Sequence, residues 1–292
     1  VLQRRMDHRF PELFESVLAG LGGPVHAVYE ANGNWSWLYE LLERIACVQS
    51  ITLANPYRVR LIAEAQIKTD KVDAQKLALL LRLGVVPACH VPDRRTRERK
   101  LLLRQRLFWV RQRTRVRNRI HKLLDRQHGL AMPQVSDLFG KKGRLALAKA
   151  QLPDSERFLL DQDLALLERL DELVRADEER IRQDGVPDPC LAIVSSVPGI
   201  GLILGSVVVA ETDGIARFPD PNRYTAYAGL VPSTHSSGGH TYHGRMLWQC
   251  NQWLKWAYIE AAWVAVGCSA YFGGLYRQLR QRGKKANTAI TI

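Results

Sequence analysis

The chain has 292 residues, 46% of them hydrophobic and seven of them Trp, so it is long enough to bury two modest cores and is not a disordered polymer. Lys and Arg number 42 against 29 acids, and a net charge of +13 favours a polyanionic partner such as nucleic acid. The five Cys are scattered and form no CxxC pair, which indicates neither a disulfide framework nor a zinc site and fits a reducing cytoplasm.

Two segments bear on membrane association. Charges at Arg4, Arg5 and Asp7 interrupt any apolar run at the start, which argues against a signal peptide. Residues 191–210 carry no charge, and about 20 apolar residues suffice to cross a bilayer. However, Pro and Gly divide this stretch into two short halves. We therefore expect a buried helix-turn-helix there and no membrane contact.

The first region alternates short strands and helices. Val25–Tyr29 and Ile51–Ala54 are β-prone runs bounded by Gly, Pro and Asn, and the Leu residues between them have helical spacing. Strand, helix and strand in this order predict a parallel pair with a crossover helix. Thr69 then has the character of an N-cap for a helix that Gly84 closes.

The segment Arg94–Arg126 holds nearly all of the net charge. It contains twelve Arg and two Lys against two acids, and its apolar residues keep steps of three and four, which predicts a long amphipathic helix. A solvated helix surface is one interpretation, but such one-sided charge favours a nucleic-acid face. The basic residues that we expect to bind nucleic acid are Arg104, Arg106, Arg111, Arg113, Arg115, Arg117, Arg119 and Lys122.

Residues 154–184 have the opposite charge, with eleven acids and five Arg. An apolar residue recurs every seven positions, the pattern of a coiled-coil seam, at Leu160, Leu167, Val174 and Ile181. This segment is expected either to pair with the basic helix as an antiparallel arm or to mediate dimerisation.

Three acids are candidates for a metal site. Glu30 follows a predicted strand, and Asp70 and Asp73 lie on one face of a helix's first turn. Acids at that position also stabilise the helix dipole without any other role. Mg²⁺ prefers oxygen ligands, and a carboxylate cluster that holds it can act on a phosphodiester.

Residues 229–245, GLVPSTHSSGGHTYHGR, form a second candidate site. Ser236 and Ser237 precede two Gly, which let the backbone expose a hydroxyl, and nearby His residues and Arg245 offer positive charge. Without further support, SSGG is typical of a flexible polar loop.

A third candidate is SSVPGIG, residues 195–201. A turn at Gly199 and Gly201 leaves backbone N–H groups free for a phosphate at a helix N-terminus, as in helix-hairpin-helix elements. A purely structural turn is an equally good interpretation.

Taken in order, YEANG, KTDKVDA, the Arg-rich helix, VPGIG, ETDGIARF, YAGLVP and HSSGG closely resemble the DEDD insertion-sequence transposases, whose relatives include pilin-gene invertases. The resemblance spans nearly the whole chain. It implies an incomplete α/β RNase H-like (resolvase-like) domain over 1–92, a helical coiled-coil arm over 93–187 and a mainly α C-terminal transposase domain over 188–292.

The resemblance also implies roles for residues. Glu30, Asp70 and Asp73 match three acids of the family's Mg²⁺-binding tetrad, and Ser237 matches its nucleophilic serine, with Ser236 as the alternative. Expected partners are DNA, a structured bridge RNA as guide and further copies of the chain joined through the coiled coil.

Two departures from the family pattern matter. The family's first Asp lies in an opening strand of the type GIDV, whereas Val1–Met6 resembles a later strand, so the tetrad is one acid short. The C-terminal GKKANTAITI stops where family members continue, and we expect a chain truncated at both ends. The rival functions are a metal-only nuclease related to junction resolvases and an inactive nucleic-acid-binding remnant.

Overall fold

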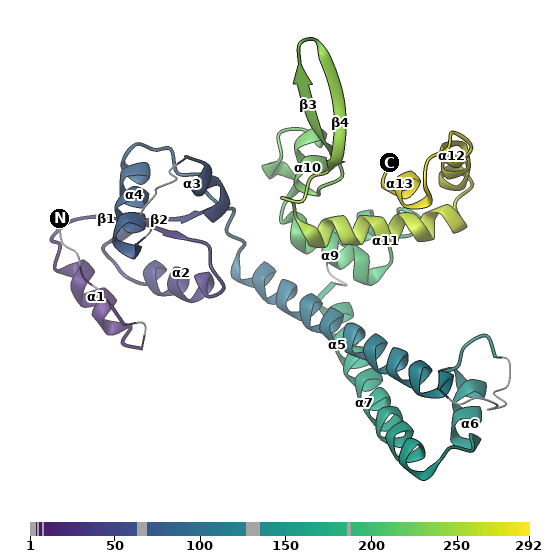
Figure 1. The fold of residues 1–292 in the computed structure, drawn as a ribbon. Coiled ribbons are helices and arrows are strands. Elements are labelled where there is room, and N and C mark those ends of the chain that lie inside the picture. Colours follow the sequence, from purple (N-terminus) through teal and green to yellow (C-terminus); the bar gives the residue numbers. More distant parts are fainter. Residues whose placement is uncertain (1–3, 5, 8, 63–68, 127–134, 186–187) are drawn as a thin grey trace. The chain divides into compact units, whose positions relative to one another are not determined.

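The structure is a computed structural model that describes residues 4, 6, 7, 9–62, 69–126, 135–185 and 188–292. These residues are mostly helical and form two small two-stranded sheets (Figure 1). The chain divides into two compact units, Val1–Pro92 and Asp93–Ile292. The expected strand over residues 1–6 falls largely outside the described residues.

The first unit is built around a parallel pair of strands. Its elements are α1 (Glu12–Ala19), β1 (Val25–Glu30), α2 (Trp35–Glu43), β2 (Val48–Ala54), α3 (Pro56–Ile62) and α4 (Asp70–Arg82). β1 and β2 pair in parallel, with Val28 opposite Thr52, and α2 is the crossover between them. The predicted strand-helix-strand unit is therefore confirmed.

Helix α4 begins and ends as its sequence predicts. The Thr69 hydroxyl accepts a hydrogen bond from the Val72 N–H at 3.3 Å, which caps the N-terminus. Gly84 follows the C-terminus with φ of +68°, a conformation that glycine adopts without strain. Leu77 and Leu80 are buried against the end of β2 and hold α4 on the strand pair.

The second unit contains two long helices followed by a mixed helical region. Its elements are α5 (Arg94–Asp125), α6 (Lys141–Lys149), α7 (Asp154–Gly185), α8 (Pro189–Ser195), α9 (Leu202–Thr212), the 3₁₀ turn η1 (Ile215–Arg217), α10 (Pro221–Tyr227), β3 (Pro232–Ser237), β4 (His240–Met246), α11 (Gln252–Cys268), α12 (Ala270–Gln281) and α13 (Ala286–Thr291).

Helices α5 and α7 lie side by side and antiparallel (Figure 1). The four residues of the predicted seam are all buried, at Leu160, Leu167, Val174 and Ile181. Ile120 and Val116 of α5 share a core with the first part of this seam, and Leu103 shares a second core with its last part. The seam is therefore filled within the chain by residues of α5, as the antiparallel-arm interpretation predicts, and dimerisation through α7 stays a prediction.

The uncharged stretch 191–210 forms a helix, a tight turn and a second helix, as predicted. Gly199 has φ of +90°, and a Cβ there would lie 2.2 Å from the Ala261 carbonyl oxygen of α11. The turn consequently packs directly on α11, and only glycine fits. In the described part of the chain, no helix combines the length and the apolar character that a bilayer crossing requires.

One prediction concerns this arm. Leu160→Ala is expected to lower the free energy of unfolding by about 2 to 5 kcal/mol, because Leu160 is 0% exposed and its loss leaves a cavity. Its neighbour Leu159 is 50% exposed, so Leu159→Ala is the matched control and should change stability by less than about 1 kcal/mol. Urea unfolding followed by circular dichroism measures both. Equal effects of the two substitutions would contradict the packing described here.

Candidate nucleic-acid face and serine hairpin

The basic residues of α5 divide into two faces. Those toward α7 meet its acids in a ladder: Arg106 Nε lies 3.0 Å from Glu178 Oε1, and Arg113 lies 3.2 Å from Asp171. Arg119 continues the ladder, donating from Nε to Asp163 at 2.8 Å. The residue numbers of the paired acids on α7 decrease as those of the Arg residues on α5 increase, as an antiparallel pair of helices requires.

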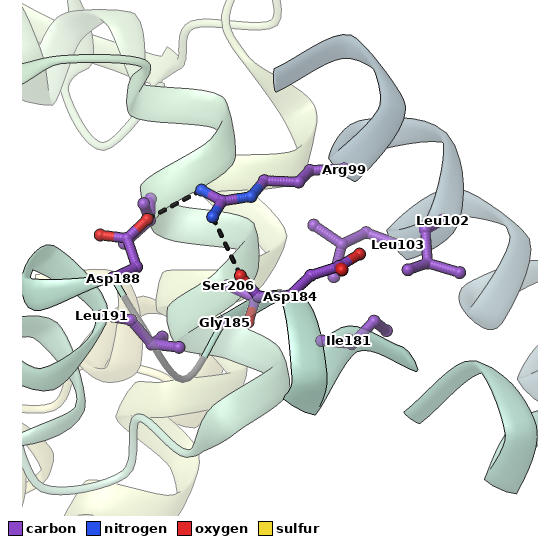
Figure 2. A pocket seen from close by; sticks show the side chains of 10 residues that line it. Arg99, Leu102, Leu103, Ile181, Asp184, Gly185, Asp188, Leu191 and Ser206 are labelled. Carbon is purple, nitrogen blue, oxygen red and sulfur yellow. Dashed lines mark hydrogen bonds and ion pairs between the residues drawn. The ribbon is translucent and has the colours of Figure 1, made fainter. Parts of the chain in front are cut away.

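The junction between α7 and α8 extends the ladder by one step. Arg99 donates to the Asp188 carboxylate at 2.8 Å and to the Asp184 carbonyl oxygen at 3.0 Å (Figure 2). The cavity beside it, lined partly by Leu103 and Ser206, measures only about 30 Å³. That volume holds about one water molecule, so this cavity is not a substrate site.

Asp177 lies on the packed side of α7 and is not one of the acids that pair with Arg in the ladder. Burial raises the pKa of Asp177, and the nearby Arg106 opposes that shift. One Asp177 carboxylate oxygen is buried without a hydrogen bond. The Arg residues on this face therefore compensate buried negative charge, which is a structural task.

The outer face of α5 carries the cations that no acid neutralises in the described residues. Arg111, Arg115 and Lys122 are exposed and make no ion pair, and Arg115 contacts only Gln112, at 3.5 Å. Phe108, 47% exposed, lies one turn before Arg111 on the same face. We name Phe108, Arg111, Arg115 and Lys122 the outer stripe.

Two further Arg residues stand apart from both sets. Arg117 lies over the Phe139 ring at 5.0 Å, and its Nε is buried without a hydrogen bond. Arg104 contacts Glu211 at 3.1 Å and the Trp253 ring at 5.4 Å, yet its side chain is 43% exposed. The uniform basic helix predicted from the sequence therefore has distinct inner and outer roles.

Ser237 lies at the tip of a β-hairpin, in place of the flexible loop expected from SSGG. β3 and β4 pair antiparallel, with Ser237 opposite His240 and Ser236 opposite Thr241. Gly238 and Gly239 have φ of +58° and +80°, the two positive values that a tight type I′ turn requires. β3 and β4 consist mostly of Thr, Ser and His residues. The sequence therefore lacks the alternation of apolar and polar residues that predicts a strand.

The hairpin distinguishes the two candidate serines. The Ser236 hydroxyl shares a hydrogen bond with Thr241 at 3.0 Å, whereas Ser237 makes no side-chain hydrogen bond to a described residue. His235 stacks on Tyr242 at 5.0 Å on the same face as Ser237, because side chains two residues apart share a face. Arg245 is exposed near the hairpin's base.

The three acids of the first unit lie on two of its elements. Glu30 ends β1 and is exposed, whereas Asp70 and Asp73 lie in the first turn of α4. In the part of the chain that the structure describes, no three His, Cys, Asp or Glu side chains lie close enough to hold a metal ion. Mg²⁺ binding by Glu30, Asp70 and Asp73 therefore stays a prediction.

Comparison with known proteins then identifies the chain. A DEDD-type IS110 model described as "Transposase" matches residues 3–128, and a model described as "Transposase IS116/IS110/IS902 family" matches residues 191–277. The first match covers nearly all of the first unit and the whole of α5, and the second runs from within α8 to within α12. The chain belongs to this family of insertion-sequence transposases, and the DEDD-type match indicates use of a divalent metal.

Individual relatives agree with this assignment. A "Probable family 20 transposase" of Pseudomonas aeruginosa is 28% identical over 232 residues, covering 73% of this chain and 66% of that protein. The "Transposase for insertion sequence element IS1111A" of Coxiella burnetii is 29% identical over 189 residues, or 64% and 51%. An insertion element IS116 protein of Streptomyces clavuligerus is 30% identical over 97 residues, or 33% and 24%. The matched segments span 24% to 66% of the length of these relatives.

The two faces of α5 predict different effects on stability. Arg113→Gln is expected to lower the free energy of unfolding by about 1 kcal/mol, because it removes a half-buried charged hydrogen bond to Asp171. Arg111→Gln on the outer stripe should change it by less than about 0.5 kcal/mol. Thermal unfolding of both variants tests this, and a greater loss for Arg111→Gln would be inconsistent with the assignment of faces.

Mg²⁺ binding by the three acids can be tested through the melting temperature. If Glu30, Asp70 and Asp73 hold Mg²⁺, about 10 mM Mg²⁺ is expected to raise the melting temperature of the parent chain, because a ligand stabilises the folded state that binds it. Asp73→Asn should melt at the same temperature with and without Mg²⁺. An unchanged melting temperature in the parent chain would contradict binding by these acids.

Proposed function

We propose that the chain cuts and rejoins DNA during transposition of an insertion sequence, with Ser237 as the nucleophile. The observation that carries this proposal is the position of Ser237 in a chain of the transposase family: its hydroxyl stands at an exposed hairpin tip and makes no hydrogen bond to the residues that the structure describes. Ser236 is the weaker candidate because Thr241 already engages its hydroxyl.

In the proposed step, the Ser237 Oγ attacks a DNA phosphorus atom and a serine-phosphate ester forms. The bond from phosphorus to the leaving DNA oxygen breaks, and that oxygen takes a proton from solvent and departs as a hydroxyl. The Ser237 proton passes to a neighbouring base, for which His240 across the hairpin is the candidate. Attack by a new DNA hydroxyl on the ester then rejoins the strand and releases Ser237, so the energy of the phosphoester bond is retained.

Nucleic acid is proposed to bind along the outer stripe. Arg111, Arg115 and Lys122 offer exposed charge for phosphates, and Phe108 offers a ring for a base. Arg104, Arg117 and Arg245 are at least partly exposed and can add contacts. Arg106 and Arg113 are largely buried against α7, and Arg119 pairs with Asp163 of α7 although its side chain is 63% exposed. We propose both DNA and a structured guide RNA as ligands, acting in the cytoplasm.

The turn at Gly199 and Gly201 contributes less than the sequence suggested. Gly199 packs against α11, whereas Gly201 caps the start of α9 and has open space around it. We propose that only the Gly201 side of the turn meets a phosphate, through the N–H groups at the start of α9.

For the metal, we propose Mg²⁺ as the divalent ion that this family match indicates. Mg²⁺ is commonly held by one or two carboxylates together with substrate phosphates. Glu30, Asp70 and Asp73 do not provide a site by themselves, so no chemical step is assigned to the ion here.

Self-association is proposed through the outer face of α7, because its seam is already filled by α5. Phe158, Leu159 and Leu166 are exposed there at 62%, 50% and 44%. These large apolar side chains of α7 are exposed and available to a second copy of the chain.

The exposed cations of the outer stripe favour a second candidate, nucleic-acid binding without cleavage. Mg²⁺-dependent cleavage of DNA by the 292-residue chain would exclude it. A metal-only nuclease is the third possibility, and it differs because it leaves no protein-DNA adduct.

The serine assignment predicts the outcome of paired substitutions. The chain is incubated with DNA in which cleavage releases a short fragment, so that the cut strand cannot be rejoined. A covalent adduct that survives denaturing electrophoresis is expected. Ser237→Ala should abolish this adduct, since no other oxygen replaces the attacking atom. Ser236→Ala is the matched control and should retain at least a tenth of the adduct, a loss of about 1.4 kcal/mol at most in barrier height.

Either of two results would overturn the assignment. Adduct formation by Ser237→Ala would place the nucleophile elsewhere. Loss of the adduct in Ser236→Ala alone would transfer the role to Ser236.

A further inference from the structure

A single buried carboxylate connects α5 to the region that follows the hairpin. Glu211, near the end of α9, is 5% exposed. Its Oε2 lies 3.2 Å from Lys100 Nζ, and its Oε1 lies 3.1 Å from a terminal nitrogen of Arg104. A buried carboxylate is costly unless cations pair with it, and both cations that pair with Glu211 come from α5.

Asn251 extends the connection to the base of the hairpin. Its Nδ2 donates to Glu211 Oε2 at 2.9 Å and to the Tyr227 hydroxyl at 3.1 Å. Its Oδ1 accepts from the N–H groups of Trp253 and Leu254, which starts α11. The polar atoms of this side chain are thus all used, and its position is set by Glu211 on one side and by α11 on the other.

Both strands of the hairpin leave from this point. The Asn251 N–H donates to the Tyr227 carbonyl oxygen at 2.8 Å, and the Leu247 N–H donates to Val231 at 3.2 Å. Gly229 has φ of +70°, and a Cβ there would lie 2.2 Å from the Cys250 sulfur. The entering and leaving chains of the hairpin are therefore joined to each other directly below it.

Tyrosines attach α10 to the same region. The Tyr224 hydroxyl lies 2.9 Å from Thr212 Oγ1 and 2.7 Å from the Tyr258 hydroxyl. Burial and the contact with Tyr224 raise the pKa of Tyr258, so its phenol stays neutral and hydrogen-bonded. Four helices, α5, α9, α10 and α11, consequently meet around Glu211 and its neighbours.

Arg104 relates this buried group to the outer stripe. It precedes Phe108 by four positions and so occupies the same face of α5 as the stripe. Its side chain is 43% exposed while it also contacts Glu211 and the Trp253 ring. A phosphate backbone that follows the stripe therefore reaches Arg104, and through it the base of the hairpin.

We propose that Glu211 is a positioning residue for the Ser237 hairpin. Its carboxylate fixes the base of the hairpin to α5 at Arg104, so that nucleic acid held on the outer stripe is presented to the hairpin tip. The catalytic part of this proposal rests on the function proposed for Ser237, but the mechanical part does not.

Hydrogen exchange on the full chain tests the mechanical part. Glu211→Gln leaves Lys100 and Arg104 without a counter-charge, and the base of the hairpin is expected to open more often. Amides in peptides covering 229–251 should exchange about tenfold faster or more, whereas peptides from α7 should not change. Glu172→Gln is the matched control, because Glu172 is an exposed acid on α7 bonded only to Arg169, and it should leave 229–251 unchanged.

A second variant tests the same contact if Glu211→Gln fails to fold. Arg104→Gln removes a partly exposed partner and is expected to speed exchange over 229–251 a few-fold. Unchanged exchange over 229–251 in the folded variants, or equal acceleration in α7, would overturn the proposal.

Strand joining tests the catalytic part separately. Glu211→Gln should lower the rate of covalent adduct formation at saturating DNA at least about tenfold, while the affinity for a DNA oligonucleotide stays within about twofold. A purely structural role would lower both together. If the parent chain forms no adduct, the function proposed for Ser237 fails, and the exchange result alone still decides whether Glu211 positions the hairpin.

Discussion

The antiparallel packing of α5 against α7 is the interaction on which the second unit depends. A helix with the charge of α5 would repel itself, and α7 relieves this by placing acids opposite Arg106, Arg113 and Arg119. The apolar seam beneath supplies most of the stabilisation, since exposed or half-exposed ion pairs contribute little on their own. The ladder fixes direction and register, and the outer stripe remains available for a ligand.

Polar and charged contacts at its base hold the β3–β4 hairpin in place. A two-stranded hairpin is only marginally stable in water, and most residues of β3 and β4 are exposed. Its order therefore comes from its base, where Asn251 and Glu211 join it to α9 and α5. The hairpin that carries Ser237 and the basic helix α5 are thus connected through Asn251 and Glu211.

Sequence patterns predicted the elements whose periodicity is strong. The seam of α7, the length of α5, the parallel strands and the Thr69 cap all follow from spacing or from cap chemistry. The β3–β4 hairpin was not predicted because its strands alternate polar residues, and only the Gly238–Gly239 pair marked its turn. Glu211 was also missed, since no local pattern shows that an acid at a helix end will be buried against a helix 107 positions away in sequence. For Glu30, Asp70 and Asp73 the metal role stays a prediction, because matching residue types does not set the distances between side chains.

The central claim is that α5 uses its inner cations for folding and its outer cations for nucleic acid, and salt dependence measures this directly. The logarithm of the binding constant for duplex DNA should fall linearly with the logarithm of the salt concentration. The slope should be about 0.9 for each phosphate contacted. Replacing Arg111, Arg115 and Lys122 together by Gln is expected to reduce that slope by about 2.7. Replacing Arg106, Arg113 and Arg119 should lower stability and leave the slope of the folded protein nearly unchanged. Equal reductions in slope for the two triple variants would contradict the account.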